Sequence, residues 1–185
     1  HEPTRHTLRR AAALLLGGCA ALLVSCDSKT SVASDDGVRN MMTQQSEDLT
    51  VILSRNGNLT YRFTTPLLER YEYALEPYTE FRKGIHIETY NDSTHQVESS
   101  LTANYAILLE NNSLEAKGNV RGHNAGGNQL ETEQLFWNQK SKLVYSNVDS
   151  KITQNTDVVY GDGFESDERF EEFVVRNPKG KVTVE

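Results

Sequence analysis

Residues 57–64 read Gly-Asn-Leu-Thr-Tyr-Arg-Phe-Thr. The apolar residues Leu59, Tyr61 and Phe63 alternate with polar ones, which is the period of a β-strand with one buried face. Residues 114–120, Leu-Glu-Ala-Lys-Gly-Asn-Val, show the same alternation. The two stretches therefore predict an all-β, antiparallel protein.

Groups of turn-forming residues separate the alternating stretches. Asn, Gly, Pro and Asp recur at short spacing, at 55–58, 91–93, 111–113, 124–128, 138–140 and 177–180. Such groups supply the backbone geometry of tight turns, so the chain is expected to contain many short strands. Residues 67–75 have fair helix propensity because they contain Glu, Arg and Ala, but we expect a strand there as well.

A weak internal repeat supports this prediction. Residues 100–106 align with 129–135, and 159–164 form a fainter third copy. Each repeat predicts two strands and a turn that share a continuous core with their neighbours; chance similarity is the alternative. Ala103 and Ala106 are an odd number of positions apart, so we expect a bulge that turns both side chains inward.

Composition excludes several classes of protein. The chain has 185 residues, 19 Lys and Arg and 26 Asp and Glu, for a net charge of -7. The length fits about one domain, and the acidic balance argues against nucleic-acid binding. Five His and two Cys leave little material for a multi-ligand metal site, so we expect neither a metal nor a cofactor.

The N-terminal segment has the pattern of an export signal. Arg5, Arg9 and Arg10 precede an apolar run at 11–24, which is shorter than the roughly 20 residues of a membrane-spanning helix. Residues 23–26, Leu-Val-Ser-Cys, resemble the bacterial lipobox, in which the Cys becomes the lipid-bearing N-terminus. Cys19 is a weaker competitor, and an uncleaved anchor helix is the other alternative. We predict a signal peptide at 1–25, a flexible polar tether at 26–47 and a folded domain at 48–185.

Signs of catalysis are weak. Glu131 and Glu133 share a strand face and form a candidate general acid and base, but such a pair is more often a solvated strand face. A glycan hydrolase that uses Glu131 or Asp162 is the weakest alternative, since no group of residues supports it. His86, His95 and His123 lack the short spacing of a metal or catalytic site. The acidic run at 162–172 predicts either protection of a sheet edge or contact with a basic partner. We therefore predict that the protein is not an enzyme.

Six segments taken together resemble a known family. Residues 57–63, 81–87, 101–106, 114–120, 130–137 and 160–164 are similar, in order and spacing, to the LptC family, the periplasmic component of the lipopolysaccharide export machine. The resemblance implies a single OstA-like antiparallel β-jellyroll, twisted and V-shaped in section. Many family members carry an N-terminal transmembrane helix, whereas this chain has a lipobox.

The resemblance also implies a function and partners. The protein would take lipopolysaccharide from an inner-membrane ABC transporter and pass it to a periplasmic bridge protein of the same fold, while a lipid on Cys26 holds it at the periplasmic face of the inner membrane. The implied lipid groove consists of Tyr61, Phe63, Phe81, Ile85, Ile87, Leu135, Trp137 and Phe164. The implied structural and partner edge consists of Gly57, Gly161, Val174, Val182 and Val184. The alternative is a structural or adaptor lipoprotein with a closed β core and no lipid cargo.

Overall fold

A computed structural model describes residues 35–183. The predicted signal peptide, Cys26 and Val184 lie outside these residues. One short helix, α2 (Asp35–Arg39), precedes fourteen strands. The strands are β1 (Gln44–Arg55), β2 (Asn58–Tyr71), β3 (Tyr78–Phe81), β4 (Ile85–Tyr90), β5 (Val97–Ala103), β6 (Tyr105–Leu109), β7 (Ser113–Asn124), β8 (Gln129–Asn138), β9 (Leu143–Ser146), β10 (Ser150–Gln154), β11 (Asp157–Gly161), β12 (Gly163–Asp167), β13 (Phe173–Arg176) and β14 (Lys181–Thr183).

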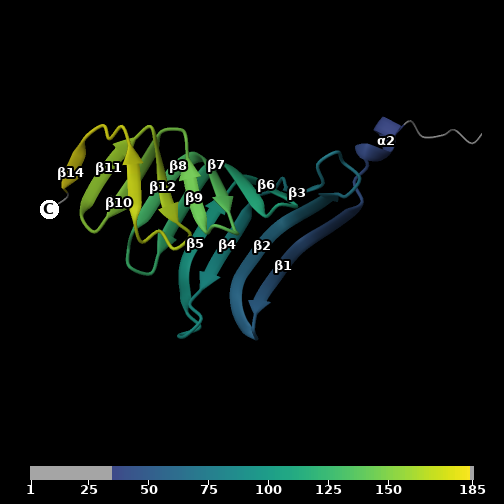
Figure 1. The fold of residues 1–185 in the computed structure, drawn as a ribbon, viewed down its shortest axis with the longest axis horizontal. Coiled ribbons are helices and arrows are strands. Elements are labelled where there is room, and N and C mark those ends of the chain that lie inside the picture. Colours follow the sequence, from purple (N-terminus) through teal and green to yellow (C-terminus); the bar gives the residue numbers. More distant parts are fainter. Residues whose placement is uncertain (1–34, 184–185) are drawn as a thin grey trace, which may run out of the picture. The chain divides into compact units, whose positions relative to one another are not determined.

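The long strands run through two layers. The first half of β2 pairs with β4 and its second half pairs with β3. In the same way β7 pairs with β6 and then β5, and β8 pairs with β10 and then β9. One layer therefore contains β4, β5, β10, β11 and β14, and the other contains β3, β6, β9, β12 and β13 (Figure 1). Every pairing is antiparallel, so the predicted all-β jellyroll is confirmed.

Local irregularities mark the points where the chain crosses between layers. In β2 the buried hydroxyl of Thr65 donates a hydrogen bond of 2.8 Å to the Gly84 carbonyl. In β7 the pairing with β8 shifts after Lys117, where Gly118 and Asn119 have positive φ angles of 73° and 47°. Such a bulge bends the strand and increases its twist.

The predicted break between the two alanines is also present. β5 ends at Ala103, β6 begins at Tyr105, and the amide of Asn104 between them bonds to the Gly118 carbonyl at 2.9 Å. Ala103 and Ala106 are both buried. Because Asn104 belongs to neither strand, the side chains of Ala103 and Ala106 both point into the interior although they are three positions apart, as expected.

Side chains in register form a continuous row across one layer. The row runs from β1 to β11 through Val51, Phe63, Ile87, Leu101, Gly122, Leu130, Ile152 and Val159. Leu101, Leu130 and Val159, the equivalent residues of the three repeats, lie on alternate strands of this row. In the other layer Ala106 and Leu135 lie on either side of Ala116. The 29-position spacing between Leu101 and Leu130 thus corresponds to a step of two strands.

Two boundaries differ from the sequence-based expectation. β1 begins at Gln44, inside the predicted tether 26–47. Its polar first residues form a strand because they pair with the second half of β2, from Gln44 opposite Arg70 to Glu47 opposite Leu67. The predicted strand 67–75 ends early, since β2 stops at Tyr71 and a turn follows. Within residues 35–183, no helix is long and apolar enough to cross a membrane.

The sheet keeps free edges at both ends of the strand series. β1 pairs only with β2, β13 only with β12, and β14 only with β11 among the residues that the structure describes. Figure 1 shows β1 at one end of the series and β14 at the other. Each of these strands therefore has one side whose backbone groups have no strand partner in the described part of the chain.

Candidate functional site

The interior between the layers contains all eight side chains predicted to form a groove. Tyr61, Phe63, Phe81, Ile85, Ile87, Leu135, Trp137 and Phe164 belong to one buried cluster. They come from β2, β3, β4, β8 and β12. Leu135 and Phe164 have 0% of their surface exposed. The sequence thus identified residues of one apolar interior; that they contact lipid stays a prediction.

Three aromatic rings lie together in this interior. The Tyr61 and Trp137 rings meet edge to face with centroids 5.4 Å apart, and Phe63 stacks on Trp137 at 6.3 Å. Aromatic pairs favour such arrangements because the edge of one ring is positive and the face of the other is negative. The polar groups of Tyr61 and Trp137 still need hydrogen-bond partners at this depth.

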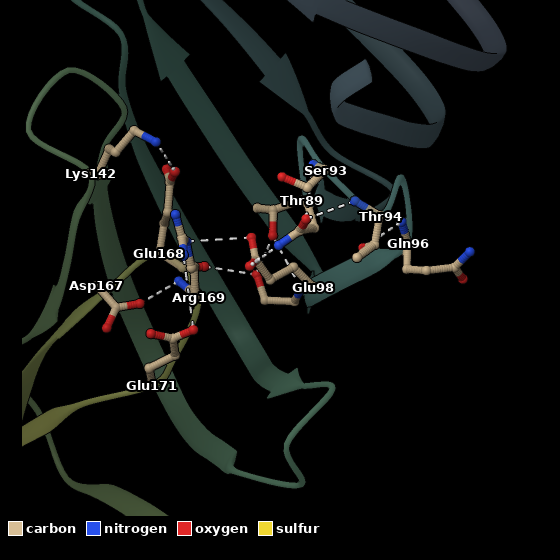
Figure 2. Close-up of polar contacts among 12 residues, drawn as sticks. Thr89, Ser93, Thr94, Gln96, Glu98, Lys142, Asp167, Glu168, Arg169 and Glu171 are labelled. Atoms are coloured by element: carbon tan, nitrogen blue, oxygen red, sulfur yellow. Dashed lines mark hydrogen bonds and ion pairs between the residues drawn. The ribbon is translucent and has the colours of Figure 1, made fainter. Parts of the chain in front are cut away.

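Glu168 supplies those partners. Its carboxylate accepts hydrogen bonds from the Tyr61 hydroxyl at 3.0 Å and from Trp137 Nε1 at 3.3 Å, and it forms an ion pair of 3.1 Å with Lys142. The Glu168 side chain is buried, and Figure 2 shows its ion pair with Lys142. A buried carboxylate is tolerated when donors and a cation surround it. Burial and this neighbouring carboxylate raise the pKa of the Tyr61 hydroxyl, which therefore stays protonated as a donor.

Glu168 belongs to a closing loop, residues 168–172, which connects the end of β12 at Asp167 to β13. The Asp167 carboxylate accepts bonds from the amides of Arg169 at 2.6 Å and Glu172 at 3.2 Å. These bonds fix a tight turn in which Phe170 has a φ of 55°. A positive φ is uncommon for a bulky residue, so this conformation depends on the contacts around it.

The closing loop joins one layer to the other. The Phe170 carbonyl accepts bonds from the side-chain amides of Asn124 at 2.9 Å and Asn128 at 2.8 Å, which flank the β7–β8 turn. The Ser99 hydroxyl of β5 donates to the Glu168 carbonyl at 2.8 Å. Arg169 forms an ion pair with Glu98 at 3.4 Å (Figure 2). β12 belongs to the opposite layer, so the loop bridges the two.

The Phe170 ring packs into the interior between the layers. It is 2% exposed and lies against Gly122, where an added Cβ would be 2.8 Å from the ring. Behind it a cavity of about 20 Å³ is lined by Leu101, Trp137 and Val144, among others. That volume holds about one water molecule. The interior is therefore closed in this structure.

The predicted edge residues lie at three different places. Gly57 lies in the β1–β2 turn with a φ of 83° and open space around it, which suits a turn rather than a close contact. Val174 on β13 is 69% exposed, and Val182 on β14 lies opposite Val158. Gly161 ends β11 beside β13, where a Cβ would collide with Val175 and come within 2.6 Å of the Arg176 carbonyl. Gly161 thus permits a close backbone approach between the end of β11 and β13.

Two of the candidate carboxylates, Glu131 and Asp162, have cationic partners. Glu131 is paired with Arg121 and Lys151, and Asp162 is paired with Lys179. The hydrogen bond from Lys151 lowers the pKa of Glu131, and the one from Lys179 lowers the pKa of Asp162. Both are held ionised and unsuited to act as a general acid. Among residues 35–183, no three His, Cys, Asp or Glu side chains are grouped to hold a metal ion.

The acidic run at 162–172 is not a uniform surface patch. Glu168 is 7% exposed and serves the interior, so the prediction that all these carboxylates face solvent or a partner was wrong for this residue. Sequence reasoning missed the closing loop because its partners are remote in the chain. The available signal was Phe170, a single aromatic residue within a charged run.

The fold and interior together define an OstA-like β-jellyroll: two antiparallel layers around a continuous apolar core. The family model described as lipopolysaccharide-assembly, LptC-related, matches residues 11–177. The match covers most of the chain, so this protein belongs to the LptC-related family. Membership gives it a role in lipopolysaccharide transport in the periplasmic cell envelope. A comparison with curated proteins found no match.

Proposed function

We propose that the protein carries lipopolysaccharide by enclosing its acyl chains between the two layers. The observation that supports this most strongly is the row of apolar residues in register from Val51 on β1 to Val159 on β11. Each methylene moved from water into such an interior contributes about 0.8 kcal/mol. No catalytic step is needed, because transport requires binding and release alone.

Loading requires the closing loop to move, since the cavity behind it is about 20 Å³. The loop can leave without breaking a strand pair, because residues 168–172 lie between β12 and β13. Its displacement breaks the bonds of the Glu168 carboxylate to Tyr61, Trp137 and Lys142. It also breaks a few further hydrogen bonds and the Arg169–Glu98 ion pair, and it removes the Phe170 ring from the interior. Acyl chains would take the place of the ring and separate the layers. The free energy needed to displace the loop then lowers the measured affinity for lipid.

The structural or adaptor alternative is favoured by the same closed interior. A protein whose core only supports its fold needs no opening, and the buried cluster is well packed as it stands. The two functions differ in what the closing loop does. In an adaptor the Phe170 ring only stabilises the fold, whereas in a carrier it also competes with lipid.

Replacing Phe170 with Ala distinguishes these functions. We expect the variant to lose about 3 kcal/mol of unfolding free energy, because a buried ring is removed, and yet to bind lipopolysaccharide several-fold more tightly, because less has to be displaced. Val120→Ala is the matched control: Val120 is fully buried in the same cluster but lies outside the loop. Urea denaturation and lipid titration measure both quantities. Lipid affinity unchanged or lowered in Phe170→Ala would support the adaptor.

We further propose that the free edges join this protein to its partners. An added strand gains main-chain hydrogen bonds and continues both sheets across the joint. The edge of β13 and β14 suits a bridge protein of the same fold. β13 ends one layer and β14 ends the other, so a partner with two layers can extend both. The edge of β1 is then left for the inner-membrane ABC transporter that supplies the lipid.

Site-specific photo-crosslinking in cells tests this assignment. A crosslinker at Val174 on β13 is expected to capture the bridge protein, and one at Ile52 on β1, which is 61% exposed, the transporter. Val97 on β5 is the control, since it is an exposed apolar residue on a strand paired on both sides. Capture of the same partners from Val97, or of neither partner from the two edges, would contradict the assignment.

The anchor is a separate proposal. Lipid on Cys26 would hold the protein at the periplasmic face of the inner membrane, with the tether between anchor and domain. Several acyl chains anchor a protein stably, whereas one does so only marginally. A Cys26→Ala variant is expected to appear in the soluble periplasmic fraction, and membrane retention equal to that of the unmodified sequence would refute the anchor.

A further inference from the structure

A second concave site lies where the end of β1 meets two turns. A pocket of about 430 Å³ is lined by Arg55 at the end of β1, Asn112 of the β6–β7 turn, and Gln139, Lys140 and Lys142 of the β8–β9 turn. Tyr61 also lines it. Because Tyr61 belongs to the buried cluster as well, the pocket adjoins the apolar interior.

The lining of this pocket is basic, although the protein as a whole is acidic. It contains three cations and no carboxylate, in a chain of net charge -7. Three other surface concavities of about 360 to 560 Å³ each include at least one Glu. The positive lining is therefore a local feature of this pocket.

Two of the three cations are uncompensated. Lys142 pairs with Glu168 at 3.1 Å, whereas Arg55 and Lys140 form no ion pair within residues 35–183. Most other Arg and Lys side chains in that part of the chain have an acidic partner. A pocket with two uncompensated cations attracts an anion.

Gln139, which lines this pocket, also carries a buried donor without a partner. The side-chain amide nitrogen of Gln139, Nε2, is buried and makes no hydrogen bond within the described part of the chain. Buried donors are nearly always satisfied, so an unsatisfied one in a basic pocket indicates a ligand that accepts hydrogen bonds.

We propose that this pocket binds the phosphate of a phosphorylated sugar headgroup whose acyl chains occupy the adjoining interior. A phosphate monoester carries about -1.5 to -2 charges near pH 7, which matches the two uncompensated cations. Its oxygens accept bonds from a guanidinium, an ammonium and an amide together. The assignment of the ligand as a lipid rests on the proposed function; the same chemistry would also bind a soluble sugar phosphate.

Calorimetric titration of the full chain in uncharged detergent tests the pocket. The probes are bisphosphorylated lipid A, the same lipid after removal of its phosphates, and glucosamine 1-phosphate. We expect Arg55→Ala/Lys140→Ala to weaken binding of the bisphosphorylated lipid about tenfold and to leave the dephosphorylated lipid unchanged. Lys83→Ala is the control for loss of an unpaired cation elsewhere on the protein, because Lys83 also lacks an ion pair in the described residues but lies in the β3–β4 turn.

Every outcome decides the proposal. The phosphate site would be overturned if the double variant lost equal affinity for both lipids, or if Lys83→Ala lost as much affinity as the double variant. Lipid carriage would still stand in either case. If the unmodified protein binds neither lipid, the proposed function fails. The titration with glucosamine 1-phosphate then shows whether the pocket binds a phosphate at all. Binding of that probe that is lost only in the double variant would support a site for a soluble sugar phosphate, and no binding would overturn the site as well.

Discussion

Gly163→Ala is expected to lower the unfolding free energy by about 3 kcal/mol, from backbone strain of about 1 kcal/mol together with overpacking. Gly163 begins β12, directly after the chain has crossed from β11 into the other layer. Its φ is 152°, and an added Cβ would collide with the backbone carbonyl of Ser146 on β9. The backbone carbonyl of Ser146 cannot rotate away as a flexible side chain could. The added methyl group would therefore force β12 and β9 apart.

Gly127→Ala separates strain from collision. Gly127 has a φ of 93°, but nothing lies within 4 Å of the position of its Cβ. We expect this variant to lose about 1 kcal/mol, from backbone strain alone. Urea midpoints of the two variants give the comparison, and equal losses would show that the close packing of β12 on β9 is not rigid.

Glu168→Ala is expected to cost about 3 kcal/mol, which makes it the other large effect. Removing the carboxylate leaves the buried Tyr61 hydroxyl and Trp137 Nε1 without an acceptor and Lys142 without its ion pair. Breaking one side of a buried, hydrogen-bonded charge group leaves the remaining groups uncompensated. The loss should appear in the urea midpoint and as increased mobility of the closing loop in hydrogen exchange.

Glu165→Ala is the matched control for this prediction. Glu165 lies on β12, three positions before Glu168, and pairs with Arg176 at 2.5 Å, but both side chains are substantially exposed. Exposed pairs contribute about 0 to 1 kcal/mol, so this variant should remain close to the unmodified protein. Similar losses in the two variants would mean that Glu168 is no more important to the fold than a surface carboxylate.

The sequence predicted the fold because its local signals agree with the tertiary structure. The alternation of Leu59, Tyr61 and Phe63 needs no knowledge of remote residues to indicate a strand with one buried face. The repeat placed Leu101 and Leu130 correctly because each repeat contributes one step of two strands to a shared core. The groove residues were brought together for the same reason: they are the inward residues of alternating strands.

The features that the sequence did not predict depend on contacts between distant segments. Gln44 begins a strand because Arg70 lies opposite it, although its neighbours are as polar as a linker. Glu168 looks like one of several acidic surface residues until Tyr61, more than one hundred positions away, donates to it. The basic pocket brings together Arg55 from the end of β1 and Lys140 from the β8–β9 turn, and no spacing in the sequence indicates that they meet.

The central claim, that acyl chains enter the space between the layers, is tested most directly by photo-crosslinking at two adjacent positions of β2 in cells that export lipopolysaccharide. Phe63 points into the interior, whereas Thr64 is exposed on the outer face of the same strand. We predict that a crosslinker at position 63 captures lipopolysaccharide and that one at position 64 does not. Equal capture at both positions, or capture at position 64 alone, would contradict the account.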